Sequence, residues 1–204
     1  LERYLTLEDR RIEPELISSG PVKEIKWTGS QIDLSKVPIV THASKDCGPY
    51  VTIGVQIGKD PDSGVRNLSI HRMLVLGKDR LSWWAPADHH LGRMILMAEE
   101  KGRGLEVATA VGVEPAIIVG SQAKVPYGID EFHVCGGLRG AAVKLTRCET
   151  IDVEVPAFAE VIIEGVTVFG ERVADGPYGE YPGCYSEAKQ APVVKVTAIT
   201  MRQN

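Results

Sequence analysis

The chain has 204 residues, of which 44% are hydrophobic and 25% charged, and its formal net charge is -4. Such a length and composition are typical of one folded domain with its own core, and they exclude fibrous and intrinsically disordered classes. Lysines and arginines are scattered, and no apolar run reaches membrane-spanning length. We therefore expect neither a nucleic-acid partner nor a membrane partner.

Cys47, Cys135, Cys148 and Cys184 are widely and irregularly spaced, without a C-x-x-C pair. This spacing predicts free thiols and a cytoplasmic protein rather than a disulfide framework or a zinc knuckle. The chain opens at Leu1 without a methionine, inside a charged stretch. We expect it to be a piece of a longer polypeptide.

Most of the predicted elements are strands. Runs that are rich in β-branched or alternating apolar residues predict mostly antiparallel strands at 50–57, 68–76, 105–111, 142–146, 151–155, 161–168 and 193–200. The residues 60–64 (DPDSG) predict a hairpin turn between the first two strands. Many strands and few helices favour an α+β fold with a barrel-like or sandwich sheet. We expect a lead-in segment at 1–45 and one domain at 46–204.

Two flanking helices are predicted, at 86–101 and 129–138. In the first, Pro86 suits the first helical turn and Gly102 the end. Its apolar stripe at i, i+3, i+4 and i+7 predicts a buried face, made of Leu91, Met94, Ile95 and Ala98. In the second helix, two adjacent glycines, Gly136 and Gly137, are expected to weaken the end.

Three residues far apart in the sequence could form a metal site. Asn67 lies on the predicted second strand, His90 in the first turn of the long helix, and Glu131 at the start of the short helix. Oxygen and nitrogen ligands without a thiolate suit Mn²⁺ or Mg²⁺ better than zinc. Read singly, these residues are also compatible with a turn asparagine, a solvent-facing histidine and a dipole-favoured helix acid.

Arg72 is unusual for its strand face, because it alternates with the apolar Leu68, Ile70 and Leu74. A buried arginine needs an anionic partner. Residues five apart on a regular strand point to opposite faces, so we predict an irregularity that lets Asn67 and Arg72 share a site.

The loop 175–185 (DGPYGEYPGCY) carries the candidate anionic partners, Asp175 and Glu180. Glycines and prolines fix its path, and three tyrosines offer apolar walls for a proton-donating carboxyl group. The alternative is a surface turn whose two acids are merely solvated.

The order and spacing of these motifs resemble the UbiD-type family of prenylated-FMN-dependent decarboxylases. The resemblance runs from about Pro49 to Arg202 and includes the stretches 131–140 (EFHVCGGLRG) and 155–165 (VPAFAEVIIEG). It implies the central cofactor-binding domain of that family, a split β-barrel related in shape to flavin-reductase domains. Full-length members continue into a C-terminal domain that covers the active site and mediates oligomerisation.

The resemblance also implies roles for individual residues. Mn²⁺ would bind Asn67, His90 and Glu131 and would hold the phosphate of prenylated FMN. K⁺ would bind near Ser121 and share Glu131. The implied cofactor-binding positions are Asn67, Ser69, Ile70, His71, Arg72, His89, His90, Ser121, Gln122 and Glu131.

Arg72, Asp175 and Glu180 match the catalytic triad of the family. The resemblance implies a reversible, non-oxidative decarboxylase of an aromatic or α,β-unsaturated acid, in which Glu180 protonates the carbon that loses CO₂. A flavin prenyltransferase would supply the cofactor, and the longer chain would form a homo-oligomer. Asp175 is one methylene shorter than the glutamate that many members carry, so we expect a shifted loop. His89 stands where some relatives carry an amide.

Two other functions stay open. The chain could be a flavin- and metal-binding domain or subunit without catalytic activity of its own. It could also be an FMN-dependent reductase, although no glycine-rich dinucleotide fingerprint is present, and that function would leave the triad and the metal ligands unexplained. Trp83 and Trp84 could wall the cofactor, with core packing expected for at least one of them.

Overall fold

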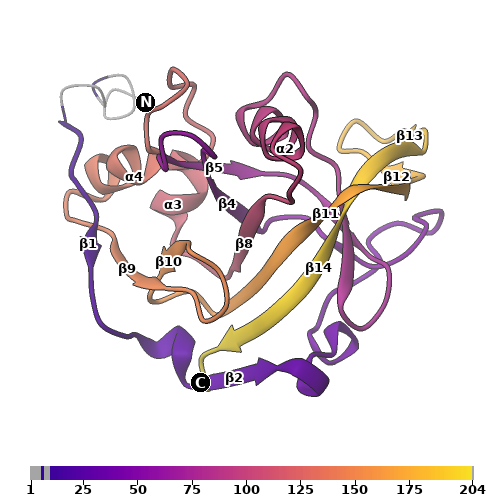
Figure 1. The fold of residues 1–204 in the computed structure, drawn as a ribbon, viewed down its shortest axis with the longest axis horizontal. Helices are drawn as coiled ribbons and strands as arrows, with labels where there is room; N and C mark the ends of the chain where they lie inside the picture. The colour runs from indigo at the N-terminus through magenta and orange to yellow at the C-terminus, as the bar shows by residue number, and fades with distance from the viewer. Residues whose placement is uncertain (1–5, 7–9, 204) are drawn as a thin grey trace.

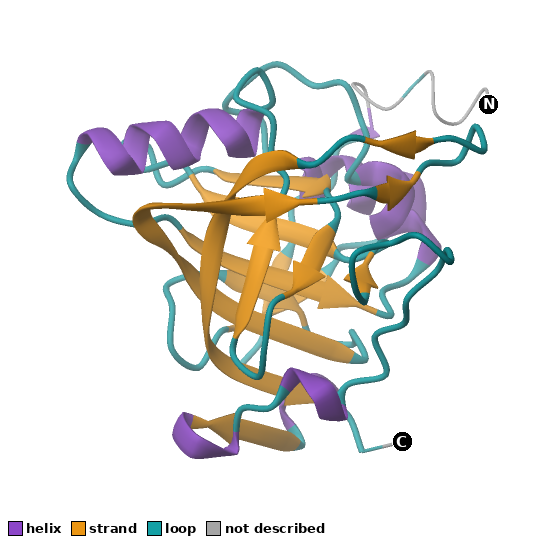
Figure 2. Cartoon of the chain, turned by 90° about the vertical axis from the view of Figure 1, so that its right-hand side faces the viewer, coloured by secondary structure: helices purple, strands orange, loops and turns teal. Residues whose placement is uncertain are grey.

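The fold is dominated by one curled antiparallel sheet. The computed structural model describes residue 6 and residues 10–203. Within this part of the chain, the sheet has nine strands, in the order β3 (Tyr50–Val51), β6 (Met73–Val75), β7 (Arg80–Trp83), β14 (Lys189–Met201), β11 (Val161–Asp175), β8 (Glu106–Val111), β4 (Val55–Lys59) and β5 (Arg66–Ile70), with β2 (Ile25–Thr28) beside β14. Figure 2 shows the sheet curled into a half-barrel, which confirms the α+β fold and its mostly antiparallel strands.

Two small sheets complete the strands. One has the order β1 (Glu15–Leu16), β9 (Lys144–Arg147) and β10 (Glu154–Pro156), and β1 runs parallel to β9. The other pairs β12 (Tyr178–Gly179) with β13 (Tyr185–Ser186) in the loop after β11. The expected hairpin at 60–64 joins β4 to β5.

Helices lie outside the sheet, as Figure 1 shows: α2 (His90–Glu100), α3 (Pro115–Gly120) and α4 (Glu131–Arg139). Short 3₁₀ turns occupy Pro21–Lys23, Gly29–Gln31 and Leu34–Lys36. The predicted stripe of α2 is buried, and it packs with Trp83 in one core cluster. Phe132 of α4 packs with Leu145 and Ile162 in a second cluster. Each fully buried side chain of this size stabilises the fold by about 1.5–3 kcal/mol. No helix in the described residues is long and apolar enough to cross a membrane.

The predicted elements differ from the observed ones in a few places. The strand predicted at 50–57 is divided into β3 and β4, and β1, β2, β7, β12, β13 and α3 were not predicted. The strand predicted at 68–76 is divided at His71 and Arg72, which confirms an irregularity, although Asn67 itself lies within β5, opposite Gly58. The long helix begins at His90 rather than Pro86, because Pro86 forms a turn in which its carbonyl accepts the His89 N–H at 3.0 Å.

The two glycines of α4 have a packing role that the sequence interpretation missed. A Cβ atom on Gly136 would lie 2.5 Å from the carbonyl oxygen of Ile12, and one on Gly137 would lie 2.5 Å from that of Arg10. The Ile12 N–H donates to the carbonyl oxygen of His133 at 3.1 Å. These glycines therefore let the N-terminal segment pass directly over the helix, which continues past them to Arg139.

The segment before residue 46 takes part in both larger sheets. β1 pairs with β9, and β2 pairs with the C-terminal half of β14. A lead-in separate from the domain that follows stays a prediction.

Candidate active site

The three candidate metal ligands converge at one point. Asn67 lies on β5, His90 is the first residue of α2, and Glu131 is the first residue of α4. The Asn67 side-chain nitrogen lies 2.6 Å from Glu131 Oε1 and 3.1 Å from His90 Nδ1. Asn67 is 4% exposed and Glu131 is 2% exposed. The amide thus lies between two acceptors, and turning it by 180° would point three acceptor atoms at a single cation.

An ion pair beside this trio holds its backbone in place. Arg66 donates to Asp130 Oδ2 through Nε at 2.8 Å and Nη2 at 2.7 Å, while Nη1 reaches Glu154 at 2.8 Å. Arg66 precedes Asn67, and Asp130 precedes Glu131. Asp130 also caps α4 by accepting the Phe132 N–H. The pair therefore aligns the β5 and α4 segments that carry two of the three ligands.

Burial disfavours the charged forms of both titratable residues of the trio. Burial raises the pKa of Glu131 to about 8, although the Leu68 N–H that it accepts at 2.8 Å acts in the opposite direction. The pKa of His90 is lowered, first by burial and then by Arg93, which keeps the ring neutral as a metal ligand must be. Among the described residues, no group of three or more His, Cys, Asp or Glu could hold a metal. The trio contains only two such residues, because its third member is an asparagine.

Tyr127 fixes the ring of His90. The two rings lie 5.1 Å apart, edge to face at 89°. The Tyr127 hydroxyl donates to Asp60, and the Arg93 guanidinium lies over the same ring at 4.5 Å. Burial and this hydrogen bond raise the pKa of Tyr127 to about 12, so it stays a neutral donor.

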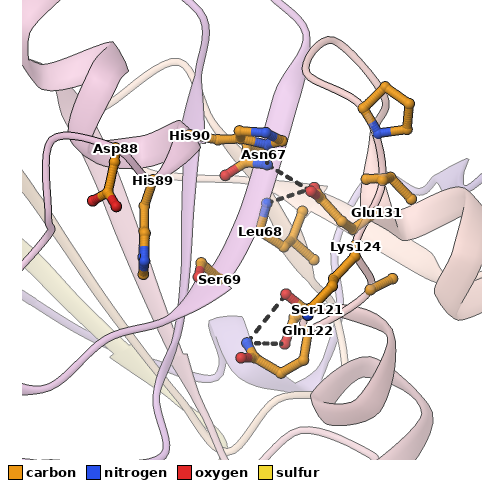
Figure 3. A pocket seen from close by; sticks show the side chains of 13 residues that line it. Asn67, Leu68, Ser69, Asp88, His89, His90, Ser121, Gln122, Lys124 and Glu131 are labelled. Atoms are coloured by element: carbon orange, nitrogen blue, oxygen red, sulfur yellow. Dashed lines mark hydrogen bonds between the residues drawn. The ribbon is translucent and has the colours of Figure 1, made fainter.

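A cavity of about 420 Å³ opens beside the trio. Figure 3 shows Asn67, His90 and Glu131 near one another, with Ser121 and Gln122 lower in the view. The cavity volume falls in the range of small-molecule and cofactor pockets. Seven of the ten predicted cofactor-binding residues line it: Asn67, Ser69, His89, His90, Ser121, Gln122 and Glu131.

The other three predicted residues, Ile70, His71 and Arg72, do not line the cavity. Ile70 ends β5 and packs against the core. His71 is 7% exposed and does not line the cavity, but its Nε2 lies 3.2 Å from His89 Nδ1 and 3.3 Å from the Ser69 hydroxyl oxygen, and both of these residues do. Arg72 points to the loop after β11. Lys124 lines the cavity and was not predicted. It is a single cation in the loop between α3 and α4, and no pattern in the sequence distinguishes it.

Arg72, Asp175 and Glu180 are brought together. Arg72 Nε donates to Asp175 Oδ1 at 3.0 Å, and Nη1 donates to Glu180 Oε1 at 2.8 Å. The guanidinium also lies 4.7 Å from the ring centroid of Tyr178. Its third nitrogen, Nη2, is buried and has no hydrogen-bond partner in the described structure. An unpaired guanidinium donor is costly, so this atom is suited to an incoming anion.

Asp175 is held by two residues that the sequence interpretation missed. Tyr50 donates to Oδ1 at 3.3 Å, and the Ser82 hydroxyl donates to Oδ2. Asp175 is fully buried at the end of β11. The shorter acid therefore reaches Arg72. Ser82 belongs to the unpredicted strand β7, and the position of Tyr50 becomes clear only when β3 is paired with β6.

The tyrosine walls expected around the loop are only partly present. Tyr178 packs against Tyr50, with centroids 4.8 Å apart, whereas Tyr181 is fully exposed and the Tyr185 side chain lies near the surface. Asp46 anchors the loop by accepting the Gly179 N–H at 2.7 Å. The two tryptophans also differ, because Trp83 is buried in the core while Trp84 lies under Lys189.

Comparison with known proteins identifies relatives over nearly the whole chain. The family described as "UbiD: 3-octaprenyl-4-hydroxybenzoate carboxy-lyase Rift-related domain" matches residues 15–204. The anhydromevalonate phosphate decarboxylase of Methanothermobacter thermautotrophicus is 38% identical over 178 residues, which are 87% of this chain and 42% of that protein.

Two solved structures are similar in fold as well as in sequence. An evolved dimeric form of the UbiD-class enzyme HmfF from Pelotomaculum thermopropionicum, in complex with prFMN, is 45% identical with a TM-score of 0.95, over 99% of this chain and 48% of that one. The closed form of vanillic acid decarboxylase from Sedimentibacter hydroxybenzoicus is 26% identical with a TM-score of 0.94, over 99% and 44%. The chain spans less than half the length of each of these relatives.

Proposed function

Because the chain belongs to the UbiD family, we propose that it provides the prenylated-FMN site of a reversible, non-oxidative decarboxylase. The substrate would be an aromatic or α,β-unsaturated carboxylic acid. The bound cofactor would supply the electron sink for loss of CO₂. The chain's own residues would bind the acid, orient it and move one proton.

The unpaired Nη2 of Arg72 carries this proposal. It is a buried cationic donor whose neighbours, Nε and Nη1, are already occupied by Asp175 and Glu180. A substrate carboxylate would satisfy it. Asp175, Glu180 and the substrate would then be three carboxyl groups around one arginine, an arrangement that favours a proton on one of them. Glu180 is the more exposed of the two acids, with a side chain 34% exposed, and is free to give that proton to carbon.

The donor set of the trio supports a manganese ion. Asn67 and Glu131 offer oxygen and His90 offers nitrogen, at an edge of the cavity where a flavin phosphate could complete the coordination. Ser121, 3% exposed in the same wall, is where we place the potassium ion. A flavin prenyltransferase would supply the cofactor, and the four free thiols are compatible with the cytoplasm.

The alternative is a flavin- and metal-binding domain without independent activity. It is favoured by one observation, that neither Arg72 nor Glu180 lines the cavity beside Asn67, His90 and Glu131. Residues outside the chain could cover Arg72 and Glu180. We also propose that the longer protein forms a homo-oligomer. The proposed substrate class includes both aromatic and α,β-unsaturated carboxylic acids.

The test is production together with a flavin prenyltransferase, followed by absorbance, manganese content and CO₂ release from aromatic and acrylic acids. We expect modified flavin and manganese in equal amounts. His90→Ala should lose both, whereas His42→Ala, at an exposed histidine, should keep both. Bound flavin and manganese without CO₂ from any acid would favour the alternative. A colourless protein without manganese would refute the proposed site.

A further inference from the structure

Trp83, His71 and His89 form a chain of nitrogen contacts that leads from the core to the cavity wall. Trp83 Nε1 lies 3.2 Å from His71 Nδ1, and His71 Nε2 lies 3.2 Å from His89 Nδ1. Trp83 is completely buried and His71 is 7% exposed. His89 lines the cavity, where Figure 3 draws its ring between Asp88 and Ser69.

The first contact fixes the tautomer of His71. An indole N–H can only donate, so His71 Nδ1 must be the acceptor. Burial lowers the pKa of His71 to about 4, and the ring is therefore neutral near pH 7. A neutral imidazole carries one proton, which must then be on Nε2. That N–H faces His89 Nδ1 and, at 3.3 Å, the hydroxyl oxygen of Ser69.

The second contact fixes the tautomer of His89 in turn. Two N–H groups that faced each other at 3.2 Å would repel, so His89 Nδ1 presents its lone pair to His71. The proton of His89 is then on Nε2, on the other side of the ring. The buried tryptophan thus sets, through two rings, which nitrogen of a cavity-lining histidine carries hydrogen.

We propose that His89 is a specificity-determining residue that presents an Nε2–H donor to the cavity and selects an acceptor atom of the bound ligand. The inference rests on the proposed function, in which that ligand is a flavin. The isoalloxazine ring offers carbonyl oxygens and unprotonated ring nitrogens as such acceptors. Trp83 and His71 are positioning residues, because they act on the ligand only through His89.

The first experiment reads the tautomers directly, without ligand and without activity. The protein is labelled with ¹⁵N-histidine, and two-bond ¹H–¹⁵N correlation spectra at pH 7 assign each ring nitrogen as protonated or unprotonated. We expect His71 and His89 both to be protonated at Nε2 and unprotonated at Nδ1. His42, an exposed histidine outside the chain of contacts, serves as the internal reference. Protonation of His89 at Nδ1 would overturn the inference.

The second experiment measures FMN affinity in protein loaded with manganese. His89→Gln keeps a side-chain N–H and should bind FMN almost as the wild type does. His89→Leu has no donor and should bind about tenfold more weakly, the effect of one lost hydrogen bond. Equal affinity of the leucine variant and the wild type would overturn the acceptor assignment.

Trp83→Phe keeps an aromatic ring in the core but removes the indole N–H. His71 should then populate both tautomers in the spectra, and His89 should follow it. Unchanged spectra would show that Trp83 does not determine the tautomers of His71 and His89. If this variant fails to fold, the wild-type spectra still test the predicted tautomers. If the wild type bound no flavin, the proposed function and the acceptor assignment would fail together, while the tautomers would be established independently.

Discussion

Asp175 and Glu180 share one arginine but occupy different environments. Asp175 is fully buried and accepts from Arg72, Tyr50 and Ser82, so its oxygens are committed to structure. Glu180 has one arginine contact and a side chain 34% exposed. The buried acid therefore holds the guanidinium, and under the proposed function the more exposed acid would be the one that exchanges a proton with a substrate.

Glu180→Gln separates proton donation from binding. The amide still accepts from Arg72 but cannot donate a proton to carbon, so we expect CO₂ release to fall by about 10²–10⁴-fold. Bound flavin and manganese should be unchanged, since Glu180 does not line the cavity. Turnover with the loaded protein and flavin absorbance measure the two effects, and Glu187→Gln, at an exposed position, is the control. A near-normal rate would show that another group donates the proton.

Asp175→Asn, in contrast to Glu180→Gln, should lower the free energy of unfolding. Asp175 is fully buried and the Arg72 side chain is 10% exposed, so removing the charge of Asp175 leaves Arg72 poorly compensated. Breaking a buried pair costs about 3–5 kcal/mol, and less here to the extent that Glu180 compensates. Denaturant unfolding of the purified variant measures this cost, with Glu180→Gln as the partner variant. The partly exposed pair of Glu180 should contribute no more than about 1 kcal/mol. Equal stability of the two variants would contradict this division of roles.

His71 should give the protein an acid-sensitive stability. Its pKa is about 4 in the folded protein against an ordinary 6.5, so between these values the unfolded chain binds a proton that the folded one does not. Stability is then complete above pH 6.5 and falls as the pH decreases, by up to about 1.4 kcal/mol per pH unit. His71→Gln should flatten this slope relative to wild type in urea unfolding from pH 4.5 to 7, whereas His42→Gln should leave it unchanged. Parallel slopes for all three proteins would show that His71 titrates normally.

At the scale of elements, the sequence predicted those helices and strands whose apolar residues repeat with a regular period within one segment. The stripe of α2 and the strands later seen as β8, β11 and β14 follow directly from apolar spacing. β2 and β12 were missed because strands of four and two residues are too short to establish a period. The site residues were identified from the order and spacing of the motifs. Their proximity in space could be predicted only by assuming the fold of the family that they resemble. Tyr50, Ser82 and Arg66 act through pairings between distant strands, which no local pattern contains.

The Arg66–Asp130 pair joins β5 to α4, and its removal should loosen the trio of candidate metal ligands. Arg66→Gln leaves β5 and α4 without their link beside Asn67 and Glu131, and losses of supporting contacts around metal ligands typically weaken metal binding by about 10–100-fold. Lys59→Gln is a matched control, because Lys59 also binds Glu154 but does not reach Asp130. Manganese titration of both variants tests this. Equal affinities would indicate that the trio is aligned by its own hydrogen bonds.

At the scale of the whole molecule, the chain returns on itself at both ends of the half-barrel. β14 pairs with β7 and β11 along its length and with β2 near its C-terminal end. β1 pairs with β9 in the small sheet. The N-terminal segment thus covers the outer side of the helix whose first residue is Glu131. The three candidate metal ligands line the cavity at the other end of that helix, away from the glycines that the segment crosses.

Gly136→Ala tests whether this covering segment and the site are independent. The added Cβ would lie 2.5 Å from the Ile12 carbonyl oxygen, closer than van der Waals contact permits. Phe132 is fully buried in the core and holds α4, so we expect the segment rather than the helix to move. Unfolding free energy should fall by about 1–3 kcal/mol, and hydrogen exchange of the Ile12 and Glu15 amides should accelerate. Gly77→Ala, which meets nothing within 4 Å, is the control. Manganese affinity should stay the same in both variants, and its loss in Gly136→Ala alone would show that the segment positions Glu131 through the helix.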